Sequence, residues 1–368
     1  MIDTKKFYDQ LVKLGVDFFA GVPDSLLANL CACIKENTPA EKNIITANEG
    51  NAVAMCAGYH LSTGKCGVVY MQNSGEGNAV NPLLSLADEK VYSIPMLLII
   101  GWRGEPGVHD EPQHVKQGEV TLELLSAMGI EYAVLGDNYE EQLDFATSHM
   151  KRTNTPYALV VRKGAFSKYS LTPEESDYTL TREDALKIIL GELSGDDVVV
   201  STTGKTSREI FEIREARGEG HSNDFLTVGS MGHTASIAYG VCVGTDKNVY
   251  CIDGDGSFLM HMGSLAVIGS NIPKNFKYIL NDNAAHESVG GQPTCTKSID
   301  IPKILSACGF ENVLVAETEK EILDSVKKLA ASEKTCLVIR TKQGSREDLG
   351  RPTTTPVENK LALMEKLK

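Results

Sequence analysis

The sequence predicts an α/β protein built from two parallel-sheet domains. Short runs rich in Val, Ile and Leu alternate with longer helical patterns along the 368 residues, and such continuous apolar strands are typical of parallel sheets covered on both faces. The alternation stops at 166–183, a polar stretch with the composition of an interdomain connector, and then resumes. A chain of this length also accommodates about two domains.

The two halves show the same order of elements. In the first half the expected strands are 18–22, 43–46, 67–72, 96–101, 131–135 and 158–162, with helical patterns at 49–62 and 78–89. In the second half the expected strands are 197–201, 224–228, 248–253, 276–281, 312–316 and 336–341. An irregular stretch, 343–356, precedes a last helix at 357–368. Because the halves form a weak pseudo-repeat, ligands are expected beside the carboxyl ends of both sets of strands.

The charge balance excludes several classes of function. The sequence has 36 basic and 49 acidic side chains, a formal net charge of −13, which repels nucleic acids and anionic membranes. It contains no apolar run of the roughly 18 residues that span a bilayer, and it begins with an amphipathic stretch rather than an apolar signal core. The nine cysteines are scattered and odd in number. We therefore expect a cytoplasmic protein with reduced thiols.

The clearest chemical pattern is a Gly-Asp-Gly-Ser string (254–257) at the end of an expected strand. Asp255 is followed 27 positions later by Asp282, at the end of the next strand, so a right-handed βαβ unit brings the two acids together. Their carboxylates are hard ligands suited to Mg²⁺, and a helix expected to begin near Ser257 offers amides to an anion. For the tripeptide alone, a hairpin with a solvated acid is the alternative.

Three further strings carry candidate residues. In ANEGNA (47–52), Glu49 opens a helix of small residues, where the helix dipole by itself also favours a glutamate. In GSMGH (229–233), Met231 is equally well explained as a core methionine between packing glycines. The string TTGKTS (202–207) lacks the leading glycine of a Walker motif, which makes an ATPase an unconvincing interpretation.

Taken in order, ANEGNA, GSMGH and GDGS with its downstream acid resemble the motifs of thiamine diphosphate enzymes. The resemblance implies a pyrimidine-binding domain at 1–165 and a diphosphate-binding domain at 184–368, joined by 166–183 without a middle domain. Glu49 would hydrogen-bond N1′ of the aminopyrimidine, and Met231 would wedge between the two cofactor rings. The expected Mg²⁺ ligands are Asp255, Asp282 and the carbonyl of Ala284. The expected cofactor-binding residues are Glu49, Asn78, Gly204, Ser230, Met231, Gly254, Asp255, Gly256, Ser257 and Asp282. The family usually has Asn at the position of Asp282.

Two longer strings narrow the resemblance. GWRGEPGVHDEPQH (101–114) and HESVGGQPT (286–294) look like those of phosphonopyruvate decarboxylases. This implies non-oxidative loss of CO₂ from 3-phosphonopyruvate in phosphonate biosynthesis, by a homo-oligomer in which the domains of Glu49 and Asp255 meet across a subunit interface. The expected catalytic residues are Glu49, Asp24, His109, Asp110 and His114, the last three on a loop. The candidates for binding the substrate anion are Arg103, Lys205 and His286.

Two alternatives stay open. Sulfopyruvate decarboxylases are close relatives whose substrate carries a sulfonate instead of a phosphonate, and the sequence does not separate the two anions. A non-catalytic subunit that binds the cofactor is the second alternative. The joint presence of Glu49, Asp255 and Asp282 argues against it, because a binding module has no need of the acid at N1′.

Overall fold

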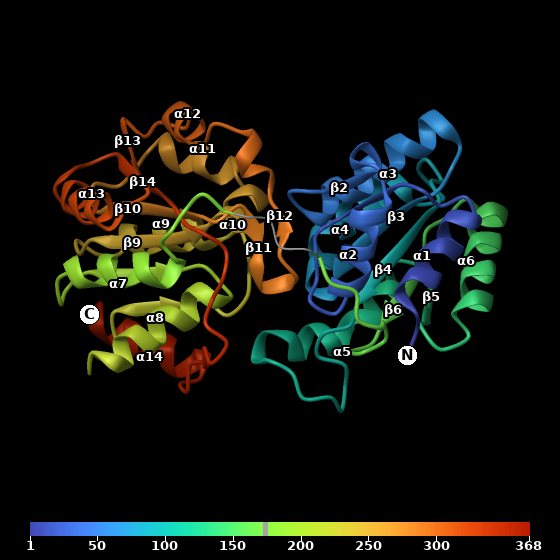
Figure 1. Cartoon of the computed structure of the whole chain (residues 1–368), viewed down its shortest axis with the longest axis horizontal. Coiled ribbons are helices and arrows are strands. Elements are labelled where there is room, and N and C mark those ends of the chain that lie inside the picture. The colour runs from blue at the N-terminus through green and yellow to red at the C-terminus, as the bar shows by residue number, and fades with distance from the viewer. Residues whose placement is uncertain (172–175) are drawn as a thin grey trace. The chain divides into compact units, whose positions relative to one another are not determined.

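The computed structural model describes residues 1–171 and 176–368 and divides into two compact units (Figure 1). One consists of Met1–Pro173 with Val289–Gln292, and the other of Glu174–Ser288 with Pro293–Lys368. Each unit contains one six-stranded sheet.

The sheet of the first unit is parallel, with strand order β2-β1-β3-β4-β6-β5. Its strands are β1 (Phe19–Gly21), β2 (Asn43–Ile45), β3 (Gly67–Gln72), β4 (Met96–Gly101), β5 (Glu131–Val134) and β6 (Tyr157–Val161). Its helices are α1 (Thr4–Lys13), α2 (Ala28–Asn37), α3 (Glu49–Thr63), α4 (Glu76–Pro82), α5 (Pro112–Ala127) and α6 (Tyr139–Thr153). Shorter helical segments are η1 (Ala40–Lys42), η2 (Asn73–Gly75) and η3 (Leu83–Ala87).

Helices cover both faces of this sheet because its strands are apolar on both sides (Figure 1). In β4, Leu97 and Ile99 pack into one core with side chains of α1, α2 and α6, whereas Leu98 and Ile100 pack into a second core with α3, α4 and α5. All four are completely buried. Burial of such a side chain contributes about 1.5–3 kcal/mol, so the two cores together fix which way each strand faces.

The sheet of the second unit is also parallel, with strand order β13-β14-β10-β9-β7-β8. Its strands are β7 (Val198–Ser201), β8 (Asp224–Leu226), β9 (Val249–Gly254), β10 (Phe276–Asp282), β13 (Asn312–Ala316) and β14 (Thr335–Arg340). Its helices are α7 (Arg182–Glu192), α8 (Lys205–Ala216), α9 (Thr234–Val243), α10 (Asp255–Met260), α11 (Gly263–Gly269), α12 (Ile301–Ala307), α13 (Glu319–Ala331) and α14 (Pro356–Lys366). Between β10 and α12 the chain also forms β11 (Ala285–His286), η4 (Glu287–Val289), β12 (Gln292–Pro293) and η5 (Cys295–Ser298).

The two sheets have the same topology. Numbered from the first strand of each unit, both follow the order second, first, third, fourth, sixth, fifth. In such sheets the chain reverses its direction of winding between the first and third strands, and ligands bind at the carboxyl ends there. The pseudo-repeat therefore places one such position between β1 and β3 and another between β7 and β9.

The predicted α/β fold with two parallel sheets is confirmed, and every expected strand lies within two residues of its predicted ends. Three details differ. The helix expected at 78–89 is instead α4 followed by η3, a π-helical turn that ends at Ala87. The helix expected near Ser257 begins at Asp255, directly after β9. The expected connector is ordered at its start, because Phe166 is buried in the core of the first unit, and residues 172–175 lie outside the described part of the chain.

Among the described helices, none has both the length and the apolar character that crossing a membrane requires. All nine cysteines are free.

Candidate active site

Glu49 is the buried acid of the first unit. It is the first residue of α3, whose N-cap Asn48 accepts a hydrogen bond from the amide of Asn51. Although it opens a helix, Glu49 is only 4% exposed, and Nδ2 of Asn78 donates to its Oε2 at 2.7 Å. Burial raises the pKa of Glu49 above its ordinary value, and the bond from Asn78 opposes that rise. A carboxyl group in this state is suited to holding or sharing a proton.

The loop after β3 is shaped around this carboxyl group. A Cβ atom on Gly75 would lie 2.1 Å from Oε1 of Glu49, so any larger residue at this position would displace the Glu49 side chain. The neighbouring Asn73 is completely buried and donates to the carbonyl of Arg103 and to the hydroxyl of Thr121. In the sequence Asn-Ser-Gly after β3, the glycine thus lets the backbone pass close to Glu49, and the asparagine supplies a buried side-chain amide that holds the loop.

Asp24 lies between β1 and β3, at the position where the winding reverses. It is completely buried and accepts hydrogen bonds from Nε2 of Gln72 at 2.6 Å and from the amide of Leu26 at 3.0 Å. A Cβ on Gly101 would come within 2.0 Å of its Oδ2. Burial raises the pKa of Asp24, while Gln72 and Leu26 oppose the rise. Gln72 was not among the expected site residues.

The remaining site candidates of the first unit lie in residues 101–114, where the structure gives them different environments. Arg103 and Asp110 form a two-pronged ion pair, with Nε of Arg103 2.8 Å from Oδ2 of Asp110. Burial acts to raise the pKa of Asp110, but Arg103 and the amide of Gly104 bring it down to about 2. His109 is exposed. The expectation that His114 lies on a loop is wrong, because Pro112 starts α5 and places His114 in its first turn.

Glu76 is a buried acid that was not among the expected site residues. It is 2% exposed, and its Oε1 has no hydrogen-bond partner. Burial raises its pKa to about 8, with Thr121 opposing the rise. His114 carries a similar unpartnered atom, Nδ1, and burial lowers its pKa to about 4. The only hint in the sequence was a charged residue inside NSGEGN, in a stretch that otherwise has small and amide side chains.

In the second unit, two carboxylates are held by two threonines. The hydroxyl of Thr294 donates to Oδ2 of Asp255 at 2.7 Å, and that of Thr296 donates to Oδ1 of Asp282 at 2.8 Å. The two hydroxyls are themselves 2.9 Å apart. Burial and the charge of Asp282 raise the pKa of Asp255 to about 7, against the bond from Thr294. Neither threonine was among the expected site residues.

Ala284 completes this group. Its backbone has φ of +55°, a left-handed conformation that a non-glycine residue rarely adopts. The amide of Ala284 donates to Oδ1 of Asp282 at 3.1 Å, and its carbonyl accepts from the amide of Thr294 at 3.1 Å. The described residues contain no group of three His, Cys, Asp or Glu side chains placed to hold a metal. Two buried carboxylates and one carbonyl are nevertheless a donor set that suits a hard cation shared with phosphate oxygens, as Mg²⁺ is.

Met231 and His286 meet beside α10. A Cβ on Gly256 would lie 3.0 Å from Cε of Met231 and 2.9 Å from Nδ1 of His286, so both side chains approach the backbone closely. Burial lowers the pKa of His286 to about 4, which leaves the ring neutral at pH 7. Ser257 accepts a hydrogen bond from the amide of Gly232 at 3.1 Å and so ties the GSMGH loop to α10.

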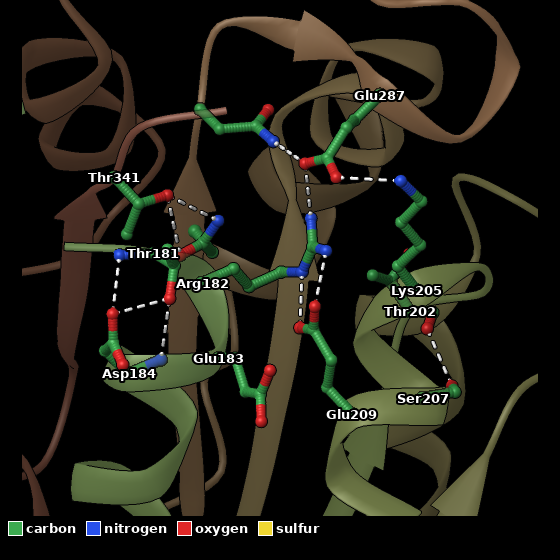
Figure 2. Close-up of polar contacts among 12 residues, drawn as sticks. Thr181, Arg182, Glu183, Asp184, Thr202, Lys205, Ser207, Glu209, Glu287 and Thr341 are labelled. Carbon is green, nitrogen blue, oxygen red and sulfur yellow. Dashed lines mark hydrogen bonds and ion pairs between the residues drawn. The ribbon is translucent and has the colours of Figure 1, made fainter. Parts of the chain in front are cut away.

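The loop residues around these side chains have unusual backbones. Ser230 has φ of +56° and Gly204 has φ of +93°, while Gly254 ends β9 and precedes α10. Lys205 is the first residue of α8, and its Nζ lies 3.0 Å from Oε1 of Glu287 (Figure 2). Both expected cations of the substrate site, Arg103 and Lys205, are thus paired with carboxylates of their own unit.

These residues fit thiamine diphosphate and Mg²⁺. Glu49 supplies a buried acid beside a glycine-lined loop, and the second unit supplies hard oxygen ligands at the carboxyl ends of β9 and β10. Family models for the N-terminal and the C-terminal thiamine pyrophosphate-binding domains of thiamine pyrophosphate enzymes match residues 4–136 and 202–340. Fold, site and family models together define a thiamine pyrophosphate enzyme.

Similarity over the whole length defines the family more closely. Phosphonopyruvate decarboxylases of Streptomyces viridochromogenes and Streptomyces hygroscopicus are 35% and 34% identical to this chain, over 97% of its length and over 93% and 92% of theirs. A sulfopyruvate decarboxylase of Methanosarcina acetivorans is 27% identical, over 89% of this chain and 88% of the relative. The chain belongs to the phosphonopyruvate decarboxylase family.

Proposed function

We propose that this chain converts 3-phosphonopyruvate into phosphonoacetaldehyde and CO₂, with thiamine diphosphate and Mg²⁺ as cofactors. In this reaction the bond between the carboxylate carbon and the ketone carbon breaks, CO₂ leaves, and a proton takes its place. The observation that carries the proposal is the buried pair of Glu49 and Asn78 in a chain that matches phosphonopyruvate decarboxylases over almost their whole length.

The proposed division of labour follows the site. Thiamine diphosphate, when bound, supplies the electron sink that makes loss of CO₂ feasible. Glu49 holds a proton at its carboxyl group and shares it with the pyrimidine ring of the cofactor. Asp255, Asp282 and the carbonyl of Ala284 hold Mg²⁺, and Met231 shapes the space beside Gly256.

Several groups can handle protons and the anionic end of the substrate. We assign proton transfer to Asp24, His109 and His114, and contact with the phosphonate to Arg103, Lys205 and His286. Asp110 has a pKa of about 2 beside Arg103, so we assign it the orientation of Arg103 rather than the transfer of a proton. Since Arg103 and Lys205 already pair with Asp110 and Glu287, each binds a substrate anion only by sharing its hydrogen bonds with that carboxylate. His286 is neutral at pH 7 and contributes an N–H donor rather than a charge.

We also propose a homo-oligomer in which the Glu49 unit of one subunit meets the Asp255 unit of another. Exposed apolar side chains on helices of both units support it: Met55 and Leu61 on α3, Val243 on α9 and Val267 on α11 are 43%, 74%, 72% and 74% exposed. Sedimentation at nanomolar concentration tests this assembly. A dimer or larger species is expected, and an active monomer would contradict it.

Sulfopyruvate is the alternative substrate, because a sulfopyruvate decarboxylase is among the relatives, though at lower identity. Comparison of kcat/KM for phosphonopyruvate, sulfopyruvate and pyruvate, with thiamine diphosphate and Mg²⁺ present, separates the two. We expect phosphonopyruvate to be preferred over both by at least about tenfold. A preference for sulfopyruvate would make sulfopyruvate the substrate instead. Comparable values for all three would contradict specificity for phosphonopyruvate.

A further inference from the structure

A cluster of four charged side chains, two of them buried and two partly buried, lies next to the turn that carries the proposed Mg²⁺ ligands. Arg182, the first residue of α7, donates from Nε and Nη2 to the two carboxylate oxygens of Glu209 at 2.7 and 2.8 Å. Its third donor, Nη1, lies 3.0 Å from Oε2 of Glu287. Figure 2 shows Arg182 between these two glutamates. Arg182 and Glu209 are 6% and 1% exposed, so water contributes little to their solvation.

Glu287 receives three donors from three different parts of the unit. Besides Arg182, its carboxylate accepts from Nζ of Lys205 at 3.0 Å and from Nδ2 of Asn283 at 2.8 Å. Burial acts to raise the pKa of Glu287, but the two cations bring it below its ordinary value, so the carboxylate is ionised. With two cations and two carboxylates the cluster is formally neutral.

The cluster holds the turn that follows β10, because Asn283 at its start and Glu287 at its end are hydrogen-bonded to each other. Asp282 ends β10, and the next four residues lead to His286 and then to Glu287. Asn283 donates to Glu287, while its Oδ1 accepts from the amide of Ala285 at 3.2 Å. Ala284, with its left-handed backbone, lies inside the loop that these bonds close. The conformation of the turn therefore depends on where Glu287 is held.

Stability alone does not account for such a cluster. Buried ion pairs are often no better for stability than apolar side chains of similar size, because removing charges from water is costly. Such pairs do orient side chains, since an arginine that donates two hydrogen bonds to one carboxylate fixes the orientation of both groups. In metal sites, groups that orient the ligands commonly change metal affinity 10- to 100-fold when they are replaced.

We propose that Arg182 and Lys205 are positioning residues that, through Glu287, fix the turn carrying Asp282, Ala284 and His286 in the geometry that binds the Mg²⁺ diphosphate. This inference rests on the proposed function, because it needs Asp282 and Ala284 to be the metal ligands. In this role Arg182 and Lys205 act through Glu287.

The chain offers a matched control. Arg214 forms the same kind of fork with Asp224, at 3.1 and 3.0 Å, and has Glu219 as its third partner. Arg214 and Asp224 are 9% and 0% exposed. Asp224 begins β8, so this pair lies at the amino ends of the strands, the edge opposite the proposed metal site. Replacing either arginine by lysine removes a buried fork, but only Arg182 contacts Glu287.

The test compares Arg182→Lys, Glu287→Gln, Lys205→Met and Arg214→Lys in the full chain. Thermal unfolding of the cofactor-free protein measures stability, and calorimetric titration with thiamine diphosphate in the presence of Mg²⁺ measures binding. We expect Arg182→Lys and Arg214→Lys to lower the unfolding temperature similarly. The first three variants should weaken binding by about tenfold or more, whereas Arg214→Lys stays within about twofold of the unchanged protein.

Binding by Arg182→Lys and Glu287→Gln within about twofold of the unchanged protein would overturn the inference and leave the proposed function standing. If the unchanged protein itself binds no thiamine diphosphate with Mg²⁺, the proposed function fails first. Should Arg182→Lys not fold, Lys205→Met and Glu287→Gln decide the matter, since Lys205 is partly exposed and the glutamine keeps the shape of Glu287.

Discussion

Nδ2 of Asn78 lies 2.7 Å from Oε2 of Glu49, and this bond joins the start of α3 to α4. A buried carboxyl group with one amide donor stays protonated more readily than an exposed one but keeps a defined orientation. The first unit thus supplies a buried acid whose carboxyl group is oriented by Asn78. This acid lies in the ANEGNA string, which resembles a motif of thiamine diphosphate enzymes.

Asn78→Ala is expected to destabilise the protein by about 1–3 kcal/mol at pH 8, because the buried Glu49 carboxylate loses its donor. Burial raises the pKa of Glu49, so the protonated form is favoured in the folded state and stability falls as pH rises above the ordinary glutamate range. The difference between variant and unchanged protein should therefore be smaller at pH 5. Urea unfolding at both pH values measures it, with Asn81→Ala on the exposed side of α4 as the control.

Thr294→Val and Thr296→Val remove the hydroxyls that hold Asp255 and Asp282 while keeping the shape of each side chain. Each change is expected to weaken binding of Mg²⁺ with thiamine diphosphate by about tenfold or more, as loss of an orienting group around a metal usually does. Thr294→Ser and Thr296→Ser retain the hydroxyl and should bind nearly as well as the unchanged protein. Calorimetry decides, and equal losses in the valine and serine variants would rule out the hydrogen bonds as the cause.

Glu76→Gln is expected to stabilise the protein near neutral pH. Burial raises the pKa of Glu76 to about 8, so folding takes up a proton there, and the glutamate costs stability as pH rises from about 4.5 to about 8. At pH 7 this cost is roughly 3 kcal/mol by linkage, and at pH 4.5 it is close to zero. Unfolding free energies measured across this range should diverge with rising pH, and a constant difference would show that Glu76 titrates normally.

Much of the fold followed from the sequence because parallel strands buried on both faces leave continuous apolar runs, as in β4 and β9. The pairing of Asp255 with Asp282 followed from βαβ geometry, which brings the carboxyl ends of neighbouring strands together. The ends of α4 and the early start of α10 were missed, since single residues such as Pro82 or Gly254 do not fix where a helix turns or begins.

The contacts that orient the site were not predictable in the same way. Thr294 comes 39 residues after Asp255, and Glu287 comes 105 residues after Arg182, so no local pattern connects them. The pairing of Arg103 with Asp110 was not predicted although they are seven residues apart, because the sequence of a loop does not show whether its charged side chains face a substrate or each other. Periodicity identifies strands and helices, whereas side-chain partners depend on the tertiary packing of loops.

The most direct test of the whole account is the Glu49→Gln variant, which keeps the size and the hydrogen-bonding shape of the side chain but holds no ionisable proton. Decarboxylation of phosphonopyruvate is measured by release of CO₂, and binding of thiamine diphosphate with Mg²⁺ by calorimetry on the same preparation. We predict a loss of at least about 100-fold in kcat, with binding within about tenfold of the unchanged protein. Turnover at the unchanged rate would contradict the role of Glu49 and with it the proposed mechanism.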